Sequence, residues 1–250
     1  MIFERDGENY EFNKAIKSDM KKIVAHSSSY KSLIPLASNT RKKSLEPFFR
    51  TFSFFKYKLI FSPISLNNCV EFLNDFSFSK ATFVRFMKSL KIGFVDLTLG
   101  NTPEETYFTF ENYAENINDL SAGLSQIVKL YLACYQTVID DKTLMIDPID
   151  YNLSVSFLTS FMQRFLNNGR NGGQIVGTCY STELLNVNIL RRDQIWFTTL
   201  DDETYATDLY SLGDINNVRK EENLRLGFLS GKYGALKTFN EDDKKLFDSY

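Results

Sequence analysis

The sequence predicts an α/β fold with a mainly helical N-terminal region, and the stretch 120–178 is the basis of that prediction. Two short apolar runs, Leu144-Met145-Ile146 and Ile175-Val176, have the composition of buried strands. Each run is preceded by a segment whose apolar residues have helical spacing, at about 121–138 and 153–167. Helix and strand therefore alternate, which is typical of a parallel sheet flanked by helices.

The N-terminal segment Ile2–Phe12 predicts a β-hairpin, because Asp6-Gly7 is a favoured two-residue turn. A hairpin at the first residue would more naturally continue an earlier sheet. Residues 13–93 then predict a mainly helical region. Its apolar residues follow helical spacing in 14–25, 66–76 and 80–90.

The segment 48–61 is dense in aromatic residues and lies next to the only concentration of basic ones. Aromatic side chains dominate the burial of protein cores, so this segment predicts a helical core in preference to a partner surface. Solvated helix faces explain the basic residues better than nucleic acid does, although a nucleic-acid-binding module remains an alternative. The basic residues concerned are Lys42, Lys43, Arg50, Lys56 and Lys58.

We divide the chain into residues 1–93, a β-hairpin with a mainly helical arm or insertion, and residues 94–250, an α/β lobe. One sheet of this lobe is expected to include the strands at 143–147, 174–178, 194–199 and 205–210. The further elements expected are a hairpin with strands at 94–99 and 106–110, and a helix from about residue 221.

Composition restricts the classes of function. The net charge of −2 supplies no global positive field that would recruit nucleic acid. Cys69, Cys134 and Cys179 are far apart in apolar contexts, which predicts buried free thiols in a reducing compartment. The single histidine, His26, has no accompanying nucleophile pattern, so we do not expect it to be catalytic. No apolar run reaches the ~20 residues that span a bilayer, and the N-terminus does not read as a signal peptide. We therefore expect a cytoplasmic protein without a membrane partner.

Three residues carry the chemical signal. Asp147 ends an apolar strand, which is where α/β sheets place ligand-contacting side chains. In ATPases that hydrolyse the terminal phosphate of ATP, an aspartate at this place holds Mg²⁺ directly or through water. Ser121 can cap the following helix, and Gly123 leaves the first turn open to an anion. Together they favour an origin in a nucleotide site over an ordinary helix cap.

With these residues the chain resembles the ABC/SMC-type AAA family ATPases of bacterial abortive-infection and related anti-phage loci. Leu120-Ser121-Ala122-Gly123 lies where the ABC signature belongs, and Leu144-Met145-Ile146-Asp147 lies where the Walker B strand belongs. The resemblance covers nearly the whole chain. It extends to Phe3–Gly7, Leu90–Asp96, Arg191–Phe197, Leu209–Leu212 and Gly227–Ala235, where Lys232 replaces the usual arginine.

The resemblance implies the C-terminal part of an ABC-type ATPase head, with a P-loop NTPase-like sheet flanked by helices. It implies ATP and Mg²⁺ as cofactors, with Ser121 and Gly123 on the nucleotide and Asp147 on the metal. It also implies a role in an ATP-dependent, anti-phage system. The implied partners are a second copy of the chain, or an ATPase subunit that carries a Walker A loop.

The chain departs from the family at its catalytic positions. Pro148 stands where the family has the glutamate that activates water, and Tyr180 stands where it has a histidine that senses the γ-phosphate. No G-x-x-x-x-G-K-[ST] loop occurs in the sequence, and Ser230-Gly231-Lys232-Tyr233 lacks the leading glycine spacing. We therefore predict a non-catalytic scaffold or regulatory subunit that is inactive as an isolated chain. The alternatives are an enzyme completed in trans by a Walker A half, and a gene remnant that folds poorly.

Overall fold

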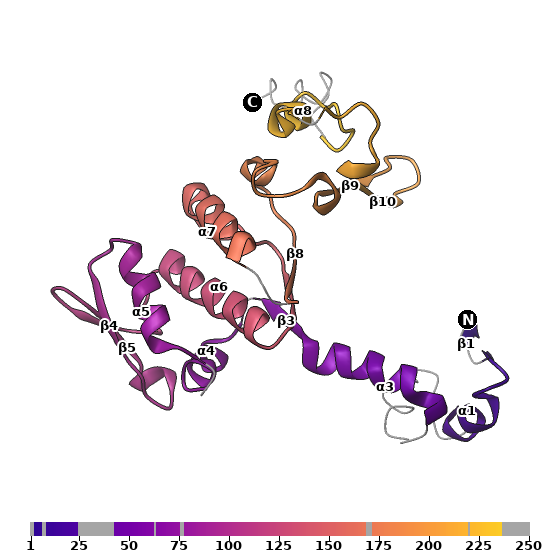
Figure 1. Ribbon diagram of the computed structural model, residues 1–250, viewed down its shortest axis with the longest axis horizontal. Coiled ribbons are helices and arrows are strands. Elements are labelled where there is room, and N and C mark those ends of the chain that lie inside the picture. Colours follow the sequence, from indigo (N-terminus) through magenta and orange to yellow (C-terminus); the bar gives the residue numbers. More distant parts are fainter. Residues whose placement is uncertain are drawn as a thin grey trace, which may run out of the picture.

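The computed structural model describes residues 3–6, 9–24, 43–62, 64–75, 78–168, 172–219 and 221–236. Figure 1 shows three regions along the chain. The arm comprises the described residues up to Lys58. The central lobe runs from Leu59 to Leu190, and the C-terminal lobe runs from Arg191 to Leu236. His26 and Lys42, which the sequence analysis discussed, lie outside the described residues.

The arm begins with the expected hairpin. Strands β1 (Phe3–Asp6) and β2 (Asn9–Phe12) pair antiparallel, with Asp6 opposite Asn9. Asp6 is therefore the last residue of β1 and not part of the turn as predicted, and Gly7 lies outside the described residues. The hairpin is followed by α1 (Lys17–Val24), η1 (Lys43–Leu45) and α3 (Glu46–Ser53), which share a small core of Ile16, Met20, Leu45 and Phe48.

The aromatic segment 48–61 does not form the helical core that its composition predicts. After α3 it continues as the π-helical turn η2 (Phe54–Lys58) and then becomes strand β3 (Leu59–Ser62). Phe48 is buried, because it faces the one apolar side that the arm encloses. Phe52 is half-buried, and five further rings are 44–64% exposed, namely Phe49, Phe54, Phe55, Tyr57 and Phe61.

A three-stranded parallel sheet forms the centre of the molecule and confirms the α/β class. Its strands are β3, β7 (Thr143–Ile146) and β8 (Gln174–Gly177), with β7 in the middle. Helices α6 (Ala122–Ile139) and α7 (Val155–Asn168) pack on one face of this sheet. Because β3 comes from the N-terminal region and pairs with β7, the sheet crosses the predicted division at residue 93, which itself stays a prediction.

A second, antiparallel sheet confirms the predicted hairpin at 94–110 and adds a strand to it. The sheet consists of β4 (Phe94–Thr98), β5 (Tyr107–Phe110) and β6 (Ala114–Asn116), with η3 (Pro103–Glu105) between β4 and β5. Helices α4 (Leu66–Leu73) and α5 (Lys80–Ser89) pack with it around Phe83 and Phe108, whose rings meet edge to face at 6.2 Å. Aromatic side chains thus fill this core, whereas most of those in the arm are exposed.

Helix α6 connects the two cores of the central lobe. Val128 and Leu132 on one side of it belong to the core with the antiparallel sheet. Leu130 and Cys134 on the other side belong to the core with the parallel sheet. Because α6 buries apolar residues on two sides, it packs against both cores of the lobe.

The C-terminal strands are present, but the single sheet expected for 143–210 is wrong. Strands β9 (Trp196–Leu200) and β10 (Thr207–Ser211) pair only with each other in the described structure. Their short connection favours a local hairpin. Their inward side chains pack into a core that is separate from that of the parallel sheet. That core includes Ile195, Phe197, Leu212, Leu224 and Tyr233. The lobe also holds η5 (Arg192–Gln194), η6 (Leu212–Asp214) and α8 (Leu224–Leu229), while η4 (Thr182–Leu184) precedes it.

Within the residues described, none of the helices combines the length and the apolar character that crossing a membrane requires.

Neighbouring residues of the central strand give a test of the fold. Leu144 is fully buried against α6 and α7, whereas Met145 points to the opposite face and is 37% exposed. We expect Leu144→Ala to lower the free energy of unfolding by about 2–5 kcal/mol, because it leaves a cavity in the core. Met145→Ala should cost about 1 kcal/mol or less. Denaturant unfolding of both variants measures the difference, and equal losses would contradict the assignment of the two faces.

Candidate functional site at the carboxyl edge of the parallel sheet

Asp147 directly follows β7, at the carboxyl edge of the parallel sheet. The hydroxyl of Thr178, which directly follows β8, donates a hydrogen bond to Asp147 Oδ1. The backbone joins the same two loops, because the N–H of Thr178 donates to the carbonyl of Ile146 at 3.1 Å and the N–H of Ile149 donates to the carbonyl of Thr178 at 2.9 Å. Asp147 therefore lies at an edge where parallel sheets present ligand-binding side chains, and it is exposed there.

Asp150 fixes the chain after β8, a role that the sequence analysis missed. Its Oδ2 accepts the backbone N–H groups of Tyr180 at 3.0 Å and of Ser181 at 2.7 Å. A carboxylate with two backbone donors acts as a brace between loops. The signal for this role in the sequence was Asp147-Pro148-Ile149-Asp150, in which a second acid follows three residues after the first.

Cys179 lies beside this brace. Burial and the neighbouring carboxylate of Asp150 raise the pKa of its thiol to about 12. Burial likewise raises the pKa of Cys69 to about 12 and raises that of Cys134 further. All three cysteines are free, with Cys69 and Cys134 buried and Cys179 half-buried, which agrees with the predicted free thiols.

Ser121 caps α6 as predicted, since its Oγ accepts the N–H of Leu124 at 3.4 Å. Gly123, in the first turn, has a different neighbour from the one expected. The carbonyl oxygen of Asn152 lies 3.3 Å from the position that a Cβ on Gly123 would occupy. The glycine thus lets the loop that follows Asp147 approach the start of α6. Ser121, Gly123 and Asp147 consequently lie at the same end of the sheet, linked by that loop.

Of the two positions that depart from the family pattern, Pro148 directly follows Asp147 and Tyr180 lies in the loop after β8. Pro148 carries no ionisable group and is half-buried. Tyr180 is 85% exposed, and it contributes to the loop through its backbone N–H rather than through its ring. Neither side chain is a carboxylate or an imidazole, so neither can take a proton from water near neutral pH.

Among the described residues, no group of three or more His, Cys, Asp or Glu side chains is arranged to hold a metal ion. Asp147 as a Mg²⁺ ligand, and Ser121 and Gly123 as nucleotide contacts, stay predictions.

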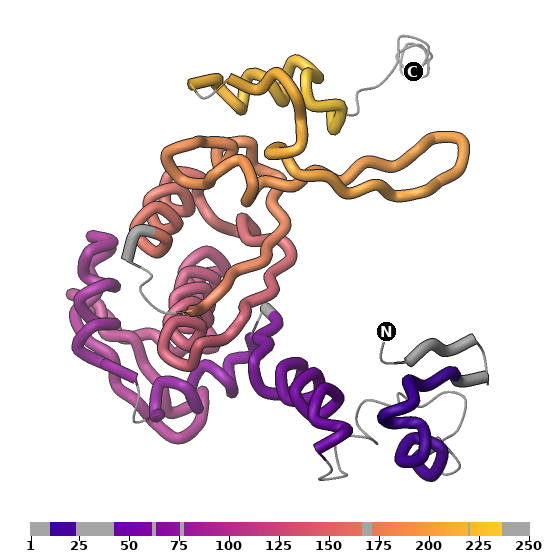
Figure 2. Tube along the Cα trace, turned by 45° about the vertical axis from the view of Figure 1, so that its right-hand side comes forward, coloured from indigo at the N-terminus to yellow at the C-terminus, as the bar shows by residue number. Residues whose placement is uncertain are grey.

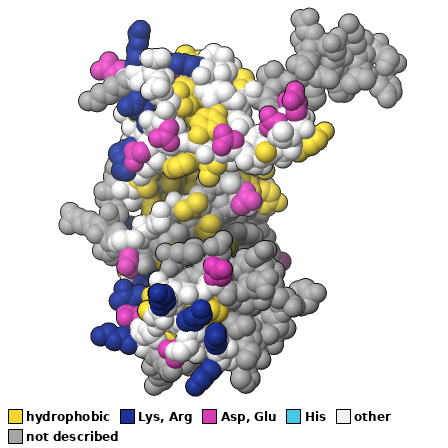
Figure 3. Space-filling model, turned by 90° about the vertical axis from the view of Figure 1, so that its right-hand side faces the viewer, with side chains coloured by type: hydrophobic (Ala, Val, Ile, Leu, Met, Phe, Trp, Pro, Cys, Tyr) yellow, Lys and Arg dark blue, Asp and Glu magenta, His cyan; other side chains and the backbone are white. Residues whose placement is uncertain are grey.

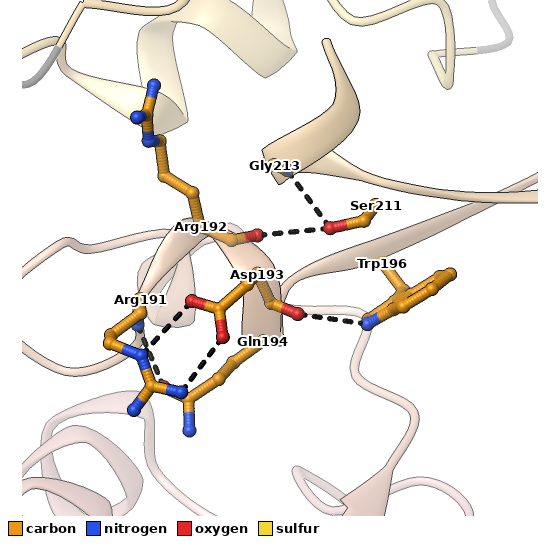
Figure 4. Close-up of polar contacts among 7 residues, drawn as sticks. All are labelled: Arg191, Arg192, Asp193, Gln194, Trp196, Ser211 and Gly213. Carbon is orange, nitrogen blue, oxygen red and sulfur yellow. Dashed lines mark hydrogen bonds and ion pairs between the residues drawn. The ribbon is translucent and has the colours of Figure 1, made fainter.

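The motif Arg191–Phe197 forms the first segment of the C-terminal lobe, and Figure 4 shows some of its polar contacts. Arg191 forms an ion pair with Asp193 at 2.8 Å, and its backbone N–H donates to Gln194 Oε1 at 2.9 Å. The indole N–H of Trp196 donates to the carbonyl of Asp193 at 3.2 Å. Arg192 turns away from this group and donates to the carbonyl of Val218 at 2.7 Å. These contacts define the local turn η5 and place β9.

The closing motif Gly227–Ala235 is held together by Glu222. Its carboxylate accepts hydrogen bonds from Lys232 Nζ at 2.6 Å and from the Tyr233 hydroxyl at 2.8 Å. The Tyr210 hydroxyl, on β10, donates to the carbonyl of Tyr233 at 2.6 Å. The side chain of Lys232, in the Gly-Lys pair that lacks the phosphate-loop spacing, is therefore hydrogen-bonded to Glu222. The two donors lower the pKa of Glu222 to about 2, with Lys232 as the larger cause.

No protein-family model matches the chain, and a comparison with curated proteins gives no significant match. The likeness to ABC-type ATPases therefore rests on the residues quoted above.

Glu222 predicts a pH dependence of stability. Its pKa in the folded state lies below the ordinary value of 4.5, so its network stabilises the fold above that pH and is lost as the pH falls towards 2. We expect Glu222→Gln to lower the Tm at neutral pH, and the difference from the wild-type Tm to shrink progressively below about pH 4.5. Thermal unfolding over a pH series measures it, with Glu221→Gln as the exposed control. A difference in Tm that stays constant down to about pH 2.5 would contradict the network.

The raised thiol pKa values predict low reactivity. Only the thiolate reacts with iodoacetamide, so the native chain should be alkylated slower than the denatured chain by roughly a factor of a hundred or more at neutral pH. Mass spectrometry of the alkylated peptides follows each cysteine separately. Fast labelling of Cys179 in the folded protein would show that its thiol is neither buried nor placed beside Asp150.

Proposed function

We propose that the chain is a non-catalytic scaffold or regulatory subunit of an ATP-dependent system, related in design to an ABC-type ATPase head. The observation that carries the proposal is the arrangement around Asp147. This acid lies at the carboxyl edge of the parallel sheet, hydrogen-bonded to Thr178, while Pro148 follows it directly and the exposed Tyr180 follows Thr178 by two residues. The site thus combines the position of a nucleotide-binding acid with neighbours that cannot activate water.

The other acid of this loop does not replace the missing base. Asp150 is half-buried, and its Oδ2 is occupied by the N–H groups of Tyr180 and Ser181. Its Oδ1 is buried away from solvent, so neither oxygen of Asp150 is presented to a water molecule at the exposed edge. ATP hydrolysis relies on positioned water and on stabilised charge, and beyond Asp147, whose proposed role is Mg²⁺ binding, the described edge offers neither a base nor a cluster of cations.

A non-catalytic subunit of this kind acts by binding to a partner subunit. The start of α6, capped by Ser121, lies at the same end of the sheet as Asp147, and in the family that this chain resembles the corresponding helix faces nucleotide bound by a partner. The role we propose is therefore to complete or regulate a partner ATPase that carries its own phosphate loop. Asp147 would contribute one Mg²⁺-compatible oxygen to such an assembly.

The proposal predicts that the purified chain does not hydrolyse ATP above the background rate in the presence of Mg²⁺, because no described group activates water. Phosphate release by the wild type, Asp147→Asn and Asp208→Asn should be the same, where Asp208 is an exposed acid of the β9–β10 hairpin. A fluorescent ATP analogue titrated in parallel reports binding. Turnover that Asp147→Asn abolishes and Asp208→Asn preserves would overturn the non-catalytic role and favour an active enzyme.

A further inference from the structure

One face of the parallel sheet carries a row of exposed apolar side chains in the described structure. Phe61 on β3, Met145 on β7 and Val176 on β8 are direct neighbours in the strand register. They form a row across all three strands, and they are 64%, 37% and 46% exposed. The alternate residues, including Ile60 and Leu144, point the other way into the core with α6 and α7. We call the row Phe61, Met145 and Val176 the open sheet face.

A parallel sheet with an open face is unusual. Parallel sheets occur almost only with both faces covered, and their strands are correspondingly apolar on both sides. The central strand follows the second half of this rule, because the three residues of β7 after Thr143, Leu144-Met145-Ile146, are all apolar. The open sheet face therefore has the composition of a surface that is buried in the working assembly.

The surroundings of this face fit a helix better than a second copy of the chain. The arm and the β9–β10 hairpin both project on the side of the sheet away from α6 and α7 (Figures 1 and 2). They stand at the two ends of the strands, so they would obstruct a second lobe before two open sheet faces could meet. The outer strands lie about 10 Å apart across the sheet, which matches the ~10–12 Å diameter of one α-helix.

Charge at the two ends gives that helix a direction. Figure 3 looks onto this side, with basic side chains on the arm below and hydrophobic ones between the arm and the C-terminal lobe. Basic residues outnumber acidic ones on the arm. In the β9–β10 hairpin, every charged residue between positions 200 and 209 is acidic. The arm's exposed basic residues are Lys14, Lys17, Lys21, Lys22, Lys43, Arg50 and Lys56, and the hairpin's acids are Asp201, Asp202, Glu203 and Asp208.

A helix carries partial positive charge at its N-terminus and partial negative charge at its C-terminus. Its favoured orientation here places the N-terminus at the acidic hairpin and the C-terminus at the basic arm. Since β3 begins at the arm and β8 leads to the C-terminal lobe, the helix would run antiparallel to the strands. Helices that cross over between parallel strands run in this same direction.

We propose that the open sheet face binds an amphipathic α-helix of a partner polypeptide, antiparallel to the strands. The apolar stripe of that helix covers Phe61, Met145 and Val176. The proposed subunit role supplies the biological source of the helix, and the inference rests on that role to this extent only. The surface itself is tested without nucleotide, so failure of helix binding and failure of the subunit role are distinguishable.

The test uses the full chain and a synthetic helical peptide as the probe. The peptide has leucines at helical spacing on a neutral Ala/Gln background, capped ends and a fluorescent label, and its control replaces every leucine by glutamine. We expect saturable binding of the leucine peptide by fluorescence anisotropy and none of the control. Met145→Lys and Val176→Lys should each weaken binding about tenfold or more, because they place a charge in the apolar contact.

Val187→Lys is the matched control, because Val187 is 42% exposed in a turn away from the sheet, and it should leave the affinity unchanged. Circular dichroism establishes that each variant is folded. Using two separate lysine variants keeps the test decisive if one of them fails to fold. Equal affinity of Met145→Lys, Val176→Lys and wild type would overturn the proposal.

Two further measurements have defined outcomes. A photo-crosslinker at the peptide's N-terminus should attach to residues 196–211, and one at its C-terminus should attach to residues 43–58, whereas the reverse pattern would overturn the orientation. Light scattering on the chain alone should give the mass of a monomer. A dimer that Met145→Lys dissociates would assign the open sheet face to a second copy and overturn the choice of occupant.

Discussion

The burial of α6 on both of its sides is the constraint on which the rest of the structure depends. Val128 and Leu132 face the antiparallel sheet, while Leu130 and Cys134 face the parallel one. Both sheets are therefore held to a single helix, and neither can shift without opening a core. The capped start of that helix is carried to the carboxyl edge of the parallel sheet, because α6 leads into β7 through a short turn and the two run in opposite directions.

The candidate site is organised by hydrogen bonds between loops more than by side chains aimed at a ligand. Thr178 is tied to Asp147, and Asp150 is tied to the backbone of Tyr180 and Ser181. Gly123 adds a close backbone approach to the same loop. A site built in this way holds its loops in place without presenting a reactive group, which suits the proposed role of a subunit that contacts a partner ATPase.

Sequence reasoning located the elements with strong local signals. The helices at 121–138 and 153–167 and the strands at 143–147 and 174–178 were confirmed, because helical spacing and short apolar runs are local properties. Strand β3, one of the two parallel partners of β7, was missed, because the aromatic-rich run Phe54–Phe61 has no periodicity that distinguishes a helical turn from a strand.

The errors in the sheet and in the site have a common physical origin. Whether β9 and β10 extend the central sheet or pair alone depends on tertiary packing around Phe197 and Tyr233, which no local pattern encodes. Asp150 was overlooked for the same reason, since its role depends on two N–H groups that lie thirty residues away in the sequence and next to it in space. Asp147 and Ser121 were placed correctly because each marks the end of a local element.

The pairing of β3 with β7 also sets an order for folding. Between the two strands the chain must complete α4, α5, the antiparallel sheet and α6. Closing so long a loop costs entropy before any contact repays it, so this pairing is a late step. During synthesis the exposed rings of residues 54–61 are made well before their strand has a neighbour. The chain thus presents its most aromatic segment to the cell while it is still growing, and a chaperone or a partner present at that moment would meet it first.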